Sequence, residues 1–150
     1  MIIIQDTREQ IPWDFSFYYT QIVEKLDTGD YTVKGYENEF VVERKKSVGE
    51  ISTNLGKEVK RFVAELKRME KFNHKHLVCE FSEQDILNFP RGSGIPRKKW
   101  RYLRMSGKFI MKRLLELCNF YDIDIHFCNN RQDAQERVVE LIEEMVAGEY

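Results

Sequence analysis

Asp30, Glu43 and Lys45 are residue types that could together hold a divalent metal ion and position a water molecule for hydrolysis. They flank two short runs of β-branched and aromatic residues, Tyr31–Val33 and Phe40–Val42. The polar, glycine-containing residues between these runs are typical of a hairpin loop. The stretch therefore predicts an N-terminal β-hairpin whose open end carries an active site.

The alternation of side chains along a strand decides which of these groups can meet. Successive residues point to opposite faces, so Glu43 and Lys45 share a face while Arg44 faces away. If the turn centres near Glu37, antiparallel pairing sets Asp30 roughly opposite Arg44, beside both members of the pair. Two carboxylates and an ammonium would then converge. The alternative is an edge strand kept soluble by its charges, with Asp30 as a turn residue.

Length and composition indicate a soluble globular domain. The chain has 150 residues, 42% of them hydrophobic and 33% charged, which is enough to bury a core and too apolar for disorder. We therefore expect a single domain over residues 1–150. The start, MIIIQD, lacks the basic beginning and long apolar run of a signal peptide, and no later run has membrane-spanning length. We expect an intracellular protein without membrane partners.

The cysteines favour a structural role over metal binding. Cys79, Cys118 and Cys128 sit in apolar sequence and form no CxxC pair, and the three histidines lie at no zinc-ligand spacing from them. We expect buried free thiols and no structural zinc site.

The net charge of −1 hides a strongly basic segment. Between Arg91 and Arg113 there are nine Lys or Arg residues and no acid, and aromatic residues are interleaved among them. Cations with aromatics between them on a loop suit a nucleic-acid backbone and exposed bases, although a solvated loop is the alternative. The nucleic-acid-binding residues predicted here are Arg97, Lys98, Lys99, Trp100, Arg101 and Arg104.

The clearest helical pattern runs from Ile51 to Met69, where apolar residues recur every three or four positions. Ser47 is a plausible N-cap, and Glu50 completes a capping-box pattern. The opposite side of this helix is basic and includes Arg61, which we expect either to be solvated or to contact phosphate.

The remaining elements favour an α/β fold. Strands are expected near residues 2–4, 77–81 and 122–127, with residues 22–26 read as a strand although a helix end is also possible. Helices are expected at 83–87, at 106–120 and from about 133 to Gly148. This order predicts a central mixed β-sheet flanked by helices on both faces, antiparallel in its N-terminal part and completed by helical crossovers.

Three motifs resemble one known family. Asp6-x-Arg8-Glu9, Gly29-Asp30-Tyr31 and Val42-Glu43-Arg44-Lys45 occur in the order and spacing of the XPF-type structure-specific endonucleases. That family belongs to the restriction-endonuclease-like, PD-(D/E)xK group, and the resemblance is closest to its short, stand-alone phage and prokaryotic versions. It implies a restriction-endonuclease-like fold in a cytoplasmic protein.

The resemblance also implies an activity. Its members hydrolyse DNA phosphodiesters with Mg²⁺ or Mn²⁺ and no small-molecule cofactor. Asp30 and Glu43 would bind the metal, with the backbone carbonyl of Arg44 as a further ligand, and Lys45 would orient the attacking water.

The same resemblance assigns three outer residues. Asp6 would support the metal site and Arg8 would contact phosphate. The family places an aspartate four residues after its lysine, where this chain has Gly49, so the neighbouring Glu50 is assigned that role.

Several functional alternatives stay open from the sequence. The DNA could be single-stranded, branched or duplex, and RNA is an alternative substrate because a metal site does not sense the 2′-hydroxyl. A catalytically silent nucleic-acid-binding module is the main alternative to a nuclease. The last helix could form a homodimer interface or complete the core of the monomer.

Overall fold

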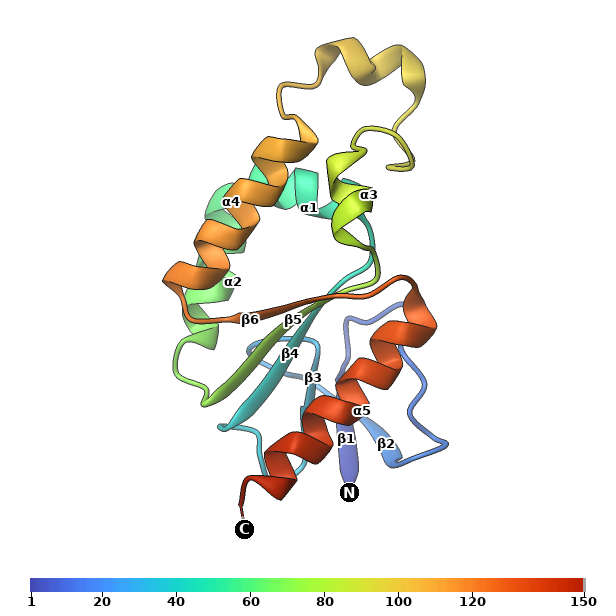
Figure 1. Ribbon diagram of the computed structural model, residues 1–150. Helices are drawn as coiled ribbons and strands as arrows, with labels where there is room; N and C mark the ends of the chain where they lie inside the picture. The colour runs from blue at the N-terminus through green and yellow to red at the C-terminus, as the bar shows by residue number, and fades with distance from the viewer. Residues whose placement is uncertain (150) are drawn as a thin grey trace.

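The computed structural model describes residues 1–149 and consists of one six-stranded sheet with helices on both faces (Figure 1). The predicted α/β fold with a central mixed sheet is confirmed. The strand order is β2-β1-β3-β4-β5-β6. The strands are β1 (Ile2–Asp6), β2 (Thr20–Glu24), β3 (Tyr31–Val33), β4 (Phe40–Lys45), β5 (His74–Cys79) and β6 (Asp124–Phe127). The helices are α1 (Val48–Leu55), α2 (Val59–Met69), α3 (Glu83–Leu87), the 3₁₀ helix η1 (Arg97–Tyr102), α4 (Gly107–Phe120) and α5 (Arg131–Ala147).

The direction of the strands differs from the prediction at one edge. β3 is antiparallel to both β1 and β4, as expected for the hairpin, and β4, β5 and β6 run parallel. β2, however, is parallel to β1. The antiparallel pairing predicted around the hairpin is confirmed, whereas the parallel direction of β2 was not predicted. Residues 7–19 supply the roughly dozen residues that such a parallel crossover requires.

The register of the hairpin differs by one residue. Tyr31 pairs with Val42, which sets Asp30 opposite Glu43 rather than opposite Arg44 as predicted. The loop from 34 to 39 includes Gly35 at a φ of +94°, and this left-handed residue fixes where the chain reverses. The corrected register brings the two acids closer to each other than the sequence suggested.

The helical pattern from Ile51 to Met69 is interrupted. α1 ends at Gly56, whose N–H donates to the carbonyls of Ser52 and Thr53, and α2 begins three residues later. The side chain of Ser47 accepts from the N–H of Glu50, so this predicted N-cap is confirmed. The Glu50 carboxylate instead accepts from the N–H of Lys46, one residue before the position that a capping box requires.

Two hydrophobic clusters hold the helices to the sheet. The cluster under α1, α2, α3 and α4 covers one face, and the cluster under α5 covers the other together with Trp13 and Phe15 (Figure 1). Val138, Ile142 and Met145 of α5 are buried there, so the last helix completes the core of the monomer. Across residues 1–149, no helix combines the length and apolarity needed to cross a bilayer.

The three cysteines confirm the expectation of buried free thiols. Cys79 and Cys118 lie in the first cluster and Cys128 lies in the second. Burial raises the pKa of all three thiols above the usual range.

Candidate active site

The hairpin, the loop before it and helix α2 enclose a polar pocket of about 190 Å³ at the end of the sheet. Asp30 and Glu43 come from the hairpin, as the sequence predicts. Two cations and two further acids lie in the same wall. The lining residues are Arg8, Asp27, Thr28, Gly29, Asp30, Glu43, Glu65 and Arg68.

Gly29 fixes the position of Asp30. Its φ is +76°, and a Cβ there would lie 2.2 Å from the Cγ2 of Val41, so the close approach of the two strands requires glycine. The N–H of Asp30 donates to the carbonyl of Val42 at 2.8 Å. Its carboxylate accepts from the N–H of Arg44 at 2.7 Å. These bonds aim the Asp30 side chain towards Glu43.

Burial and mutual repulsion disturb the ionisation of the two acids. Burial first, and the charge of Glu9 after it, raise the pKa of Asp30 to about 6 although the Arg44 N–H stabilises its anion. Burial and then the charge of Asp30 raise the pKa of Glu43 well above the usual range. Two carboxyl groups held together in this way favour sharing a proton or binding a cation.

Lys45 lies beside Glu43, as the strand alternation predicts. Its Nζ is 3.8 Å from an oxygen of Glu43 and 5.1 Å from the centre of the Phe62 ring. Burial alone would lower the pKa of Lys45, but the charges of Glu43, Glu50 and further acids outweigh it and raise that pKa. Lys45 is therefore an ammonium at neutral pH and can donate hydrogen bonds.

Asp6 lies outside the pocket lining and acts on the pocket by holding Arg8. One oxygen of the buried Asp6 carboxylate accepts from the N–H of Leu26 at 2.8 Å, and the other accepts from the Arg8 Nε at 2.6 Å. Although burial would raise the pKa of Asp6, these hydrogen bonds lower it overall. Asp6 thus holds the guanidinium of Arg8 at the pocket, and both of its oxygens are engaged within the chain.

The Arg44 side chain lies on the opposite face of the strand, as predicted. Its Nε donates to Glu80 at 2.7 Å and its Nη1 donates to Glu9 at 2.8 Å, while the guanidinium stacks 4.7 Å from the Trp13 ring centre. All of these groups are largely buried. Arg44 therefore braces the loop after β1 against β5, and only its backbone N–H touches the Asp30 carboxylate.

Two other predicted residues lie outside the pocket lining. Glu50 begins α1, and it acts on Lys45 through its charge rather than through a contact. The Arg61 side chain is 73% exposed and pairs with Glu58 at 3.8 Å.

Glu65 and Arg68 are pocket residues that the sequence did not single out. They are three positions apart in α2 and therefore share a face of that helix. The charge of Glu65 acts on both Glu43 and Lys45. Their spacing is a signal in the sequence, but nothing there shows that this face of α2 meets the hairpin.

Thr28 is the other residue that the sequence missed. Its Oγ1 is buried and has no hydrogen-bond partner among residues 1–149, and Thr28 lines the pocket. An orphaned hydroxyl in such a place favours a bound water or ligand oxygen.

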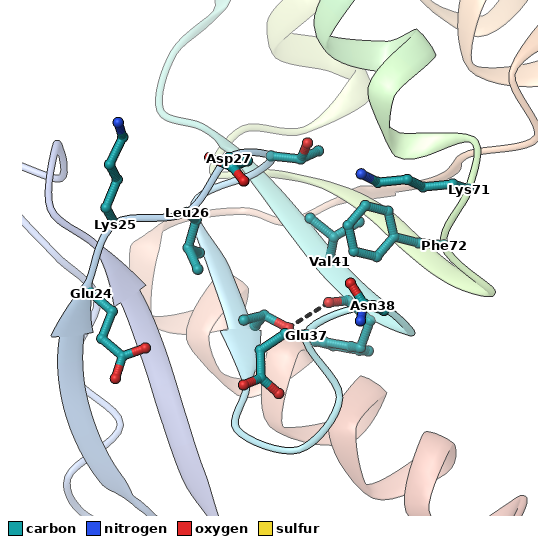
Figure 2. Close-up of a pocket in the computed structure, with 12 residues that line it drawn as sticks. Glu24, Lys25, Leu26, Asp27, Glu37, Asn38, Val41, Lys71 and Phe72 are labelled. Atoms are coloured by element: carbon teal, nitrogen blue, oxygen red, sulfur yellow. Dashed lines mark hydrogen bonds between the residues drawn. The ribbon is translucent and has the colours of Figure 1, made fainter.

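A second groove shares lining residues with the pocket, and Figure 2 shows the side chains that line it. Asp27 and Thr28 line both cavities, and the groove has a volume of about 200 Å³. Figure 2 shows Lys71 and Phe72 on one side of it and Lys25 on the other. The same groove is also lined by three acids, Glu24, Asp27 and Glu37, so its two lysines give it no net positive charge to attract an anionic chain.

The basic segment forms an exposed arch rather than an irregular loop. It contains η1 and projects from the end of the molecule where α1, α3 and the start of α4 gather (Figure 1). The Arg97 guanidinium lies 5.6 Å from the Trp100 ring, and that of Arg101 lies 4.8 Å from the Tyr102 ring. The arch thus presents cations already paired with aromatic faces to the solvent.

The donor set fits a magnesium-type ion. Among residues 1–149, no group of three or more His, Cys, Asp or Glu side chains is arranged to hold a metal. Mg²⁺, however, commonly takes only one or two protein carboxylates and completes its shell with water and substrate phosphate. The hard oxygens of Asp30 and Glu43, whose mutual repulsion a cation would relieve, meet that requirement.

Replacing Asp30 by Asn is expected to stabilise the metal-free protein. The pKa of Asp30 is about 6 in the fold against 3.8 ordinarily, so the folded state binds more protons and loses stability as pH rises through this window. Asparagine does not ionise, so the variant does not lose stability as pH rises through this window. We expect a gain of about 1–3 kcal/mol in the free energy of unfolding at pH 8. Urea unfolding in chelator should show the gain shrink towards zero near pH 4. A variant less stable than the parent at pH 8 would contradict the electrostatic account.

Comparisons with known proteins agree with this architecture. A family model described as ERCC4 domain matches residues 5–141, whereas no curated protein matches the chain. The structure is similar to that of XPF from Aeropyrum pernix, with a TM-score of 0.70 and 16% identity over 97% of this chain and 61% of that one. The structure of XPF from Aeropyrum pernix in complex with DNA gives a TM-score of 0.68 and 16% identity over 98% and 66%.

The chain spans less than two thirds of either of those chains, and at such identity the likeness concerns the fold. The family match covers nearly the whole chain, and it agrees with the three motifs that the sequence carries. The chain therefore belongs to the ERCC4 domain family, the XPF-type nuclease family that its motifs resemble.

Proposed function

We propose that this protein is a metal-dependent endonuclease that hydrolyses DNA phosphodiester bonds, with a preference for branched or flap structures. The observation that carries the proposal is the buried pair of Asp30 and Glu43 with the ammonium of Lys45 alongside. A fold gains no stability from carboxylates that repel each other in this way. The relative solved in complex with DNA supports DNA as the substrate.

The proposed mechanism assigns one task to each pocket residue. Asp30 and Glu43 would hold the divalent ion, which when bound would neutralise charge on the scissile phosphate and lower the pKa of a bound water. Lys45 donates a hydrogen bond to the attacking water or to the developing anionic oxygen. Arg8, held by Asp6, binds a non-bridging phosphate oxygen.

The residues of α2 extend this mechanism. Arg68 faces the same pocket and supplies a second guanidinium for the phosphate. Glu65 adds negative charge beside Lys45 and helps to keep it protonated. The Oγ1 of Thr28 is available to hold a water or a phosphate oxygen.

Direct cleavage assays test the proposal. The protein is incubated with single-stranded, duplex, flap and four-way DNA, in Mg²⁺, in Mn²⁺ and in chelator, and with RNA copies of the same strands. Cleavage of DNA with either metal and none in chelator is expected. Binding of DNA without cleavage under every condition would instead identify a catalytically silent module.

The basic arch is expected to contribute phosphate contacts. Replacing Arg97, Lys98 and Lys99 together by Gln should reduce the slope of log affinity against log salt by about two to three, because each lost contact removes about 0.7–0.9. Fluorescence anisotropy across a salt series measures the slope. The matched control replaces three exposed cations outside the basic segment, Lys34, Arg131 and Arg137, with the same change in net charge. Equal slopes in the two variants would exclude the arch from the interface.

A further inference from the structure

We infer that a cavity between α1 and the basic arch, here called the base pocket, binds one unpaired nucleotide of the DNA substrate close to the cut. The inference rests on the proposed nuclease function and deepens it, because it makes an unpaired nucleotide part of what the protein recognises. The base pocket has a volume of about 410 Å³ and is distinct from the pocket that contains Asp30 and Glu43.

The lining of the base pocket suits the flat face of a nucleobase. Phe89, Ile95 and Met105 supply apolar surface and are anchored in the cluster under α1 to α4. Tyr102, a residue that is 66% exposed, adds an aromatic ring at the rim, and the Arg101 guanidinium lies 4.8 Å from the centre of that ring. Stacking of bases on aromatic side chains is tolerant of sequence because every base has a π-face.

The polar groups of the base pocket suit the edge of a base and its phosphate. The hydroxyls of Ser52 and Thr53 both donate to the carbonyl of Gly49, which leaves their oxygens free to accept from a base amino group or ring N–H. Lys57 and Arg104 are exposed at the rim, where cations can meet the phosphates on either side of the bound nucleotide.

The position of the base pocket relates it to the cut. Helix α1 starts three residues after Lys45, and the base pocket lies along its second half, from Ser52 to Gly56. At a rise of about 1.5 Å per residue, this is about 6–12 Å from the start of the helix. The base pocket and the pocket of Asp30 and Glu43 therefore lie on neighbouring elements, with α1 following directly on the strand that carries Glu43 and Lys45.

Recognition by the base pocket distinguishes unpaired from paired DNA. A base can enter an apolar cavity only after leaving its stack and its partner, which costs a few kcal/mol in a duplex and least in a strand that is already single. The base pocket therefore favours flaps and the arms of branched DNA over continuous duplex, and it does so without reading a particular base.

The test moves a single abasic site, one nucleotide at a time, through the single-stranded arm of a splayed duplex. Affinity for wild-type protein in chelator is measured by fluorescence anisotropy. We expect a loss of about tenfold at one arm position, with changes below about twofold elsewhere, since one base stacked on an aromatic contributes on this scale. Tyr102→Ala is expected to weaken binding of the intact substrate by a similar factor and to remove the dependence on position.

Controls separate this inference from the proposed function. Tyr18→Ala removes another exposed tyrosine, one that lies outside the base pocket, and should leave the profile unchanged. Urea unfolding checks that Tyr102→Ala is folded, and the exposed Lys57→Gln provides a second variant expected to lower affinity. A flat profile in a protein that cleaves DNA would overturn the base pocket and leave the nuclease proposal standing. A position-dependent profile without cleavage in any metal would support the base pocket and overturn the nuclease proposal.

Discussion

Glu43→Gln is expected to reduce DNA cleavage by about 10³-fold or more, which corresponds to about 4 kcal/mol in the barrier. Glutamine keeps the size of the side chain and its ability to accept a hydrogen bond, but it removes the negative charge that a divalent ion requires. DNA affinity in chelator should not fall by more than about threefold, because Glu43 makes no attractive contact with phosphate when no metal is present. Single-turnover cleavage of a labelled flap substrate, alongside anisotropy on the same DNA, measures the two effects separately.

A second active-site variant and a control variant test the same expectation. Lys45→Met removes the ammonium beside Glu43 while retaining the packing against Phe62, and it should also abolish cleavage without loss of binding. Glu136→Gln serves as the matched control, because Glu136 is exposed on α5, which packs on the other face of the sheet from α2, and its loss should affect cleavage far less. Cleavage by Glu43→Gln at the parental rate would mean that the reaction takes place elsewhere on the protein.

Arg44→Met is expected to lower the free energy of unfolding by about 3–5 kcal/mol. The Arg44 side chain is 2% exposed, and its donors satisfy two carboxylates that are themselves nearly buried. Methionine would fill much of the space but would leave Glu9 and Glu80 charged, close together and without a counter-ion. Urea unfolding at neutral pH measures the loss.

A variant that also removes the charges of Glu9 and Glu80 provides the control for this effect. The triple variant Glu9→Gln, Arg44→Met and Glu80→Gln should recover most of the lost stability, because a buried charge cluster replaced as a whole costs far less than one broken in half. A loss below about 1 kcal/mol in the single variant would mean that water reaches Glu9 and Glu80 more readily than their burial indicates.

The sequence predicts the hairpin and its chemistry because these depend on local rules. Alternation along a strand places Glu43 and Lys45 on one face and Arg44 on the other, whatever the rest of the fold does, and the structure agrees. The capping serine at position 47 and the short helix at 83–87 are equally local and are also found as predicted.

The features that the sequence did not predict depend on how distant segments meet. The hairpin register is set by the conformation of a six-residue loop, and an error of one residue there changed the partner of Asp30. The break between α1 and α2 leaves the apolar spacing intact and so has no signature in that pattern. Glu65 and Arg68 become pocket residues only because α2 packs beside the hairpin, and no local sequence pattern shows this tertiary contact.

The buried state of Cys79, Cys118 and Cys128 has a practical consequence for studying the protein in solution. The thiolate is the reactive species, and burial both hides these sulfurs and disfavours their ionisation. A maleimide dye should therefore not react with the three native cysteines and should label only a newly introduced cysteine. Asn88→Cys, at an exposed position next to Phe89 and outside the lining, would place a single fluorophore beside the base pocket, so that the arrival of a DNA arm could be followed in real time on individual molecules.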